Sequence, residues 1–206
     1  MRAARRRTCT RQAGFTLIES LVVVAVIGIL VLISAPAFLK MMNRFKLTGT
    51  TRELTSLMQA ARQEAIKMNA PAQVNYDATS NSFFAFVDLD RDQVLSAPDR
   101  ILAARIPVPK KVEFRGPGDA GVNGANAIDG WDDAPSVRLG PVFNPDGSAD
   151  RVGSFRLKDS NDNFLEVRIQ MPATGRMVLR KYFDAEDAFF VNGEIVGSIV
   201  HKWEWK

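Results

Sequence analysis

The hydrophobic pattern changes character near residue 40. Residues 15–39 form an unbroken apolar run in which Glu19 is the single charged side chain. A helix rises about 1.5 Å per residue, so this run is long enough to cross a hydrocarbon layer roughly 30 Å thick. A carboxylate inside that layer costs on the order of 2.5–3.5 kcal/mol and by default marks a functional position. The pattern therefore predicts a membrane-spanning helix with a functional glutamate.

The next segment, residues 40–70, is amphipathic and continues the helix. Its apolar positions recur at steps of three and four, which predicts a stripe that packs under a sheet. The run 48–51, Thr-Gly-Thr-Thr, is a poor helix former and predicts local fraying, and Ala70-Pro71 predicts the end of the helix. The stripe consists of Leu54, Leu57, Met58, Ala61, Ala65 and Met68.

Residues 71–206 contain short strand patterns separated by turn residues. Together with the long helix they predict an α+β fold, in which an antiparallel sheet packs on the second half of the helix. Asn192-Gly193 predicts a type I′ hairpin, and a further strand near 199–206 would place Trp203 and Trp205 on one face. The other expected strands are 73–76, 83–88, 100–106, 111–115, 137–139, 153–157, 164–169 and 177–180.

The charge is concentrated at the N-terminus. Residues 1–14 hold five arginines and no acid, and without them the 27 basic side chains of the chain fall to 22, against 23 acidic ones. A domain that binds polyanions over its whole surface is therefore not indicated. The basic leader before the apolar run predicts that the leader stays cytoplasmic and that the bulk of the chain crosses the membrane.

Reactive side chains are scarce. Cys9 lies in the leader, so residues after it have no disulfide or thiol chemistry. His201 is the only histidine, and it has no partner that the sequence identifies, so we interpret it as surface or structural. No nucleophile elbow or metal cluster is present, and we therefore expect that the chain is not an enzyme.

Three interpretations account for the N-terminal segment. A cleaved secretory signal with small residues at 35–37 conflicts with the length of the apolar run, and an ordinary anchor leaves the glutamate unexplained. The run Gly14-Phe15-Thr16-Leu17-Ile18-Glu19, followed by the long apolar helix, resembles the processing site of type IV prepilins. That resemblance implies cleavage between Gly14 and Phe15 by a membrane prepilin peptidase, and N-methylation of Phe15.

Two positions in the helix acquire an assembly role through the same resemblance. The buried charge of Glu19 needs a partner, and the new ammonium group at Phe15 of a neighbouring subunit can supply it. Pro36 matches the proline that pilin helices often carry at this depth, and its missing N–H is expected to kink or loosen the helix.

The run 59–67, QAARQEAIK, is similar to the "ARxEAIxR" helix end of the GspH/FimT family, with Met68 at the last arginine of that pattern. The family comprises type II secretion minor pseudopilins and type IV minor pilins. The resemblance implies a structural subunit without a cofactor, held in the bacterial inner membrane with its C-terminal domain in the periplasm and then assembled into a pilus or pseudopilus. Its implied partners are the prepilin peptidase, other pilins or pseudopilins, the inner-membrane assembly platform and membrane lipid.

An acidic segment offers a candidate cation site. Asp88, Asp90 and Asp92 alternate, and Asp99 follows, so their carboxylates resemble the hard oxygen ligands of a calcium loop. Gln93 stands where an EF-hand needs glycine. The segment is also similar to the "FxDxNxNGxxDxGExIL" hairpin of the family, and we favour a plain acidic turn over a metal site.

A basic segment near the end of the expected sheet raises DNA binding as an alternative function. In FimT-type pilins that take up DNA, a G-R-x-R motif at this place binds it, and this chain has Gly175 and Arg176 but Val178 at the second arginine. Arg176 and Arg180 would share a strand face, with Lys181 adding charge. A solvated edge strand is the competing interpretation. The tryptophan-containing tail is interpreted as a sheet extension or, alternatively, a contact surface for a neighbouring pilin.

Overall fold

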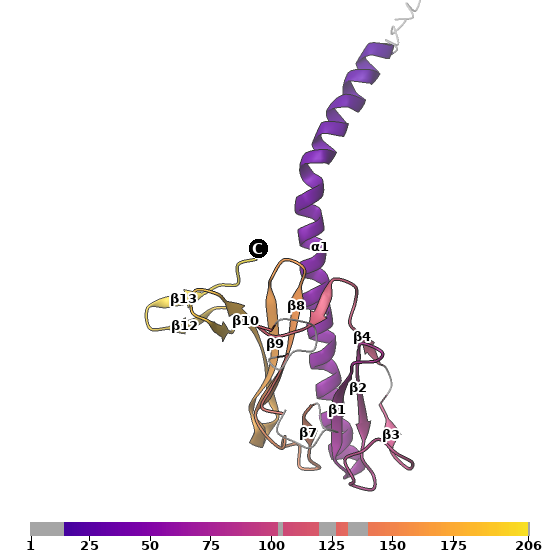
Figure 1. Cartoon of the computed structure of the whole chain (residues 1–206), viewed down its shortest axis with the longest axis vertical. Helices are drawn as coiled ribbons and strands as arrows, with labels where there is room; N and C mark the ends of the chain where they lie inside the picture. Colours follow the sequence, from indigo (N-terminus) through magenta and orange to yellow (C-terminus); the bar gives the residue numbers. More distant parts are fainter. Residues whose placement is uncertain (1–14, 103–104, 120–126, 132–139, 206) are drawn as a thin grey trace, which may run out of the picture. The chain divides into compact units, whose positions relative to one another are not determined.

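The computed structural model describes residues 15–102, 105–119, 127–131 and 140–205. The chain divides into two compact units, Met1–Leu39 and Lys40–Lys206. One helix, α1 (Leu17–Met68), runs from the first unit into the second, and all the described strands belong to the second (Figure 1). The segments expected at 15–39 and 40–70 are therefore parts of the same helix.

The first unit presents its side chains outward. All residues from Phe15 to Leu39 are exposed, and α1 is, within the described part of the chain, the helix long and apolar enough to cross a membrane. The helix continues through Pro36. The proline therefore does not interrupt the secondary structure of this segment.

The second half of α1 is helical where the sequence predicted fraying. Residues 48–51 are buried or half-buried within the helix. The Thr51 hydroxyl donates to the Leu47 carbonyl at 2.6 Å, and the Thr50 hydroxyl donates to the Lys46 carbonyl at 3.0 Å. These bonds satisfy the hydroxyl groups locally, and packing against the sheets outweighs a glycine penalty of about 1 kcal/mol. The fraying prediction was wrong.

The first sheet contains β1 (Ala72–Asp77), β2 (Ser82–Val87), β3 (Arg100–Ile101), β4 (Ile106–Pro107) and β7 (Val142–Phe143). Its antiparallel strands follow the order β3-β2-β1-β7, and β4 pairs with another part of β2. Along β1, the alternate residues Ala72, Val74 and Tyr76 enter the core, as the two-residue repeat of a strand requires.

The second sheet contains β5 (Val112–Phe114), β6 (Ile128–Asp129), β8 (Gly153–Asp159), β9 (Phe164–Met171), β10 (Arg176–Phe183) and β11 (Ala188–Phe190). The order is β11-β10-β9-β8-β5, all pairs are antiparallel, and β6 pairs with β8. A short 3₁₀ helix, Pro172–Thr174, joins β9 to β10. The register shifts between Arg176 and Met177, where β10 begins.

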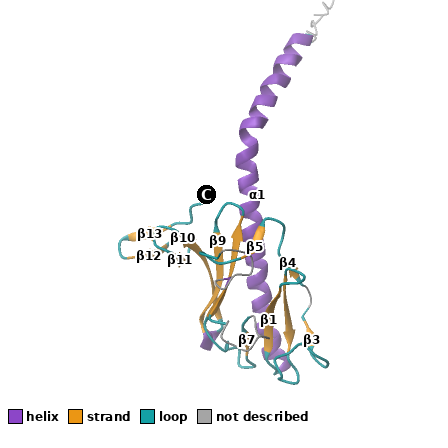
Figure 2. Cartoon of the chain, in the orientation of Figure 1, coloured by secondary structure: helices purple, strands orange, loops and turns teal. Residues whose placement is uncertain are grey.

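Both sheets share one core with α1. Figure 2 shows the strands of both sheets beside the second half of the helix. Phe83 of the first sheet packs against two rings of the second, with centroids 5.5 Å from Phe114 and 5.3 Å from Phe155. Leu54 and Met58 of the helix are fully buried in the same cluster. The predicted α+β architecture is confirmed, with two antiparallel sheets.

Most strand expectations agree with the structure. The segments expected at 73–76, 83–88, 111–115, 153–157, 164–169 and 177–180 are strands with slightly different ends. The single strand expected at 100–106 is instead the two short strands β3 and β4. The strand expected at 137–139 lies outside the described residues.

The C-terminal pairing differs from the expectation. A turn forms at Asn192-Gly193, since the N–H of Glu194 donates to the carbonyl of Val191 at 3.0 Å and Gly193 has a φ of 81°. It is not the predicted type I′ turn, because that turn needs a positive φ at Asn192 as well, and Asn192 does not have one. The flanking strands, however, do not pair with each other. β11 adds to β10, whereas β12 (Glu194–Val196) pairs with β13 (Ile199–His201).

The end of β13 also places the tail differently. The strand ends at His201, so Trp203 and Trp205 lie beyond it and pack, half-buried, on the core. His201 has a partner that the sequence did not reveal: its ring stacks on Phe190 with centroids 3.8 Å apart and is buried. Of the two interpretations of His201, surface or structural, the structure supports the structural one.

Candidate functional site

The processing segment opens α1. Thr16 precedes the first helical residue, and its hydroxyl oxygen accepts the backbone N–H of Glu19 at 3.3 Å, which is an N-cap bond. Glu19 lies in the first turn, where the unpaired N–H groups of the helix favour a negative charge. The sequence thus builds a helix start that tolerates a carboxylate at the edge of an apolar run.

The predicted cleavage bond lies at the limit of the description. Gly14 is outside the described residues, and Phe15 is the first residue described, with an exposed side chain. Phe15, Glu19 and Pro36 occupy the same exposed segment, Phe15–Leu39. Their roles in processing and assembly stay predictions.

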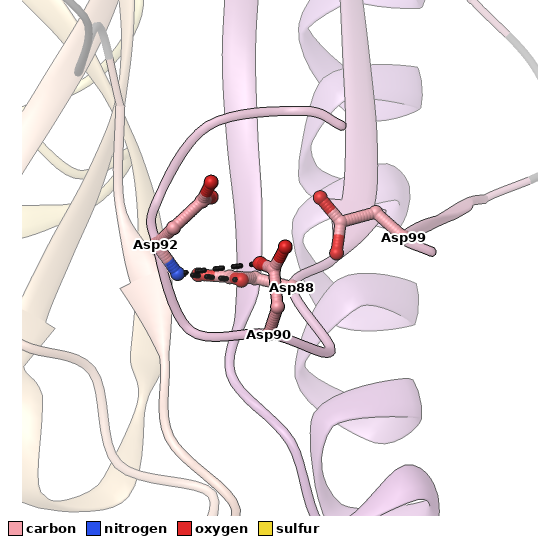
Figure 3. Close-up of side chains that lie close together, drawn as sticks. All are labelled: Asp88, Asp90, Asp92 and Asp99. Atoms are coloured by element: carbon pink, nitrogen blue, oxygen red, sulfur yellow. Dashed lines mark hydrogen bonds between the residues drawn. The ribbon is translucent and has the colours of Figure 1, made fainter. Parts of the chain in front are cut away.

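The acidic loop between β2 and β3 gathers four carboxylates. One oxygen from each of Asp88, Asp90, Asp92 and Asp99 lies within 4.8 Å of the others. In Figure 3, Asp92 and Asp99 flank the central pair Asp88 and Asp90. The residues that the sequence singled out are therefore brought together by the fold.

Backbone N–H groups of the same loop bind these carboxylates. The oxygens of Asp88 accept from the N–H of Asp92 at 3.2 Å and of Gln93 at 2.9 Å. Those of Asp99 accept from Leu89 at 2.8 Å and from Ser96. Burial raises the pKa of Asp88, although the Gln93 bond opposes the shift. The loop holds its carboxylates with its own backbone, as an acidic turn does.

The three basic residues proposed for DNA contact occupy different surroundings. Arg176 is exposed, Arg180 is half-buried, and Lys181 is buried. Lys181 lies on the core side of β10, and its ammonium group is 5.7 Å from the centroid of Trp205. Strand alternation places the adjacent residues Arg180 and Lys181 on opposite faces, and the register shift after Arg176 separates that residue from the regular part of the strand. Their role in DNA binding stays a prediction.

Arg180 belongs to an ion-pair network on the outer face of the second sheet. The network centres on Glu166, whose side chain is fully buried. Its oxygens accept from Arg180 Nε at 2.8 Å, from Arg156 Nε at 3.2 Å and from Ser154 Oγ at 2.6 Å. Asp129 extends it, receiving Arg156 at 3.0 Å and Arg168 at 2.8 Å.

The sequence analysis missed this network. Its members come from β6, β8, β9 and β10, and neighbouring strands bring them together: Arg156 lies opposite Glu166, and Glu166 lies opposite Arg180. The sequence did contain one signal of the network: charged residues interrupt the apolar pattern of strands that lie next to each other in the sheet. Recognising it required the strand register, which the sequence does not state.

The comparisons with known proteins agree with this architecture. Residues 9–35 match the model of the prokaryotic N-terminal methylation motif. Residues 50–175 match the model of type II transport protein GspH, which covers the end of α1 and most of both sheets. The chain belongs to the GspH family. No curated protein and no solved structure matches it. The resemblance to the GspH/FimT family is therefore confirmed.

Membership assigns this chain to the minor pilins and pseudopilins of type IV pili or type II secretion. The GspH match includes the acidic loop and ends at Gly175, immediately before Arg176. The segment that carries Arg180, Lys181 and the C-terminal tail lies after the matched residues. The family match therefore says nothing about these features, which have to be argued from the structure of this chain.

We predict that Glu166→Gln strongly destabilises this GspH-family domain. The change keeps the size of the side chain and removes the charge that pairs with Arg156 and Arg180. Their side chains are 16% and 24% exposed, so we expect a loss of about 3 kcal/mol, the lower end for a broken buried pair. Chemical denaturation of the full chain in detergent measures it. Lys67→Ala, in the exposed pair with Glu64, is the control and should change stability by less than about 1 kcal/mol. Equal losses would contradict the prediction.

For the acidic loop, we predict equal thermal midpoints in calcium and in chelator, because the loop's own N–H groups already hold Asp88 and Asp99. A cation that bound the folded state would raise the midpoint by mass action. The measurement uses the full chain in detergent and the variant Asp90→Asn. A calcium-dependent rise that this variant abolishes would reject the acidic-turn interpretation and identify a cation site.

Proposed function

We propose that the chain is a minor pilin or pseudopilin that prepilin peptidase cleaves between Gly14 and Phe15 before it enters a filament. The observation that carries the proposal is the pair of matches within one chain, the methylation motif over 9–35 and GspH over 50–175. The apolar part of α1, up to Leu39, lies between the cleavage bond and the segment that matches GspH. Processing site, membrane segment and globular domain follow in the order that such a subunit needs.

The chemistry of the N-terminus supports an assembly step. Cleavage would leave a positively charged amino group on Phe15, one helical turn before the carboxylate of Glu19. In an apolar environment each charge is costly alone, and pairing between neighbouring subunits offsets that cost. Because the side chains of Phe15–Leu39 are exposed, the segment is available to lipid before assembly and to other subunits afterwards.

The remaining parts of the proposal concern location and partners. The subunit would reside in the bacterial inner membrane with residues 40–206 in the periplasm, since five leader arginines favour the cytoplasmic side. Its partners would be prepilin peptidase, other pilins or pseudopilins, the assembly platform and lipid. Its role would be structural, and the chemistry at Gly14 would be performed on the chain by the peptidase.

We predict that intact-mass measurement of the full chain from cells with prepilin peptidase detects the loss of residues 1–14 and a methyl group on Phe15. Cells with an inactive peptidase should yield the uncut chain. Ala37→Leu alters the small-residue site of a secretory signal and should leave cleavage at Gly14 unchanged. An uncut chain in the presence of active peptidase, or cleavage after Ala37, would refute the proposal.

DNA capture is a second candidate function, and one observation favours it. Exposed Arg176 and Arg62 of α1 line a polar cavity of about 420 Å³. Gly175, at φ 59°, lies against Arg62, and a Cβ there would come within 2.7 Å of Arg62 Nε. Glycine therefore leaves room for Arg62, whose Nε donates to the Gly147 carbonyl at 2.7 Å. Guanidinium groups that line one cavity can bind phosphate oxygens.

The DNA prediction concerns Arg176 in particular. Anisotropy titration of the full chain in detergent with duplex DNA at low salt should detect binding that Arg176→Ala weakens, with the salt slope reduced by about 1. Lys110→Ala removes an exposed cation elsewhere in the domain and is the matched control. No binding at low salt, or equal weakening by both variants, would exclude DNA capture through this site.

A further inference from the structure

The C-terminal arm, residues 191–205, exposes an apolar hairpin. Ile195 and Ile199 are 67% and 57% exposed, and Val196 and Val200 are about half exposed. They belong to β12 and β13, which pair with each other and with no other described strand. An isolated two-stranded hairpin is marginal in water, and an exposed apolar cluster of this kind marks a contact surface.

The arm is fixed to the domain at its base. The indole N–H of Trp203 donates to the carbonyl of Phe190 at 3.1 Å, and His201 stacks on the same phenylalanine. The guanidinium carbon of Arg44, in α1, lies 4.5 Å from the ring centroid of Trp205. The hairpin is therefore presented by a defined anchor and is not a loose terminus.

That anchor lies close in the chain to the membrane segment. Arg44 follows Leu39 by five residues, which bridge at most about 18 Å and about 7.5 Å as a helix. The headgroup layer of a bilayer is roughly 5–8 Å thick on each side. Between the two residues, Met41 and Met42 are exposed, and so is the following Phe45. The Arg44 contact of Trp205 thus lies only five residues along the chain from Leu39, in a stretch with exposed apolar side chains.

The chemistry of the arm matches a lipid surface. Trp203 and Trp205 are half-buried against the core, and the part of each ring that stays exposed suits the membrane interface, which tryptophan favours. The stretch from Ile195 to Val200 contains no charge, so it can enter an apolar layer without a counter-ion. Lys40 and Lys46 flank the anchor in sequence and suit anionic headgroups.

We propose that the C-terminal arm docks on the bilayer surface beside the chain's own membrane segment, with the β12–β13 hairpin in the interfacial layer. The arm is thus a second membrane contact of the subunit before assembly. This inference rests on the membrane storage included in the proposed function. It goes beyond that function because residues 191–205 lie outside both family matches.

The test places a spin label on the arm in the full chain. In a Cys9→Ser background, Ile199→Cys is labelled and the protein is reconstituted into vesicles of zwitterionic and anionic phospholipid. Val94→Cys is the control, since Val94 is an exposed aliphatic residue of the acidic loop. The acidic loop begins at Asp88, whose N–H donates to the carbonyl of Pro71, just beyond the end of α1. The helix from Arg44 to Met68 is about 36 Å long, so the loop starts near the opposite end of this part of the helix from Arg44.

The readout is accessibility to oxygen, which concentrates in lipid, and to a water-soluble nickel chelate. We expect the oxygen-to-nickel ratio to be several-fold higher at position 199 than at position 94. Similar ratios in protein that floats with the vesicles would overturn the arm proposal alone. Protein that fails to float would overturn membrane storage as well. Spin–spin broadening at position 199 that disappears on dilution with unlabelled chain would instead assign the hairpin to contact with a second copy, and would reject lipid docking.

Discussion

The second half of α1 is the element on which the rest of the globular unit depends. Leu54, Met58 and Ala61 are fully buried, and both sheets reach the same helical stripe through a shared aromatic cluster. Neither sheet has a second apolar layer of its own among the described residues. Packing both sheets on one helix, and on each other through Phe83, removes their apolar faces from water.

Periodicity was sufficient to predict the parts of the structure with long, regular patterns. The apolar run and the three- and four-residue steps after it predicted α1 to within a residue or two of its end at Met68. Helix propensity failed for Thr50 and Thr51, because it describes an isolated helix, whereas these residues are packed and their hydroxyls bond to the backbone of the preceding turn. Periodicity failed for β6 and β7, because a strand of two residues has no alternation to detect.

Among the candidate sites, too, the sequence revealed the local one and missed the one that depends on strand pairing. Asp88, Asp90, Asp92 and Asp99 were found from sequence because they are local, and a loop of twelve residues suffices to gather them. The Glu166 network was missed because it is non-local and depends on register. Strand pairing also explains why the basic residues of β10, which are neighbours in sequence, have different surroundings in the structure. Arg180 is committed to Glu166, while the neighbouring residue points to the opposite face and is covered by the tail.

The full exposure of Phe15–Leu39 has a consequence for how the subunit changes environment. None of these side chains contributes to the core of the domain, so the folded unit after Leu39 keeps all its buried contacts whichever solvent surrounds the N-terminal segment. Moving from lipid into a filament would exchange one apolar medium for another around the helix without unfolding the sheets. The free energy of that transfer would then be governed by local changes, chiefly the pairing of Glu19 with a neighbouring subunit and the loss of surface contacts near the bilayer. In the assembly that we propose, such a subunit would be stored fully folded and would enter the filament without refolding.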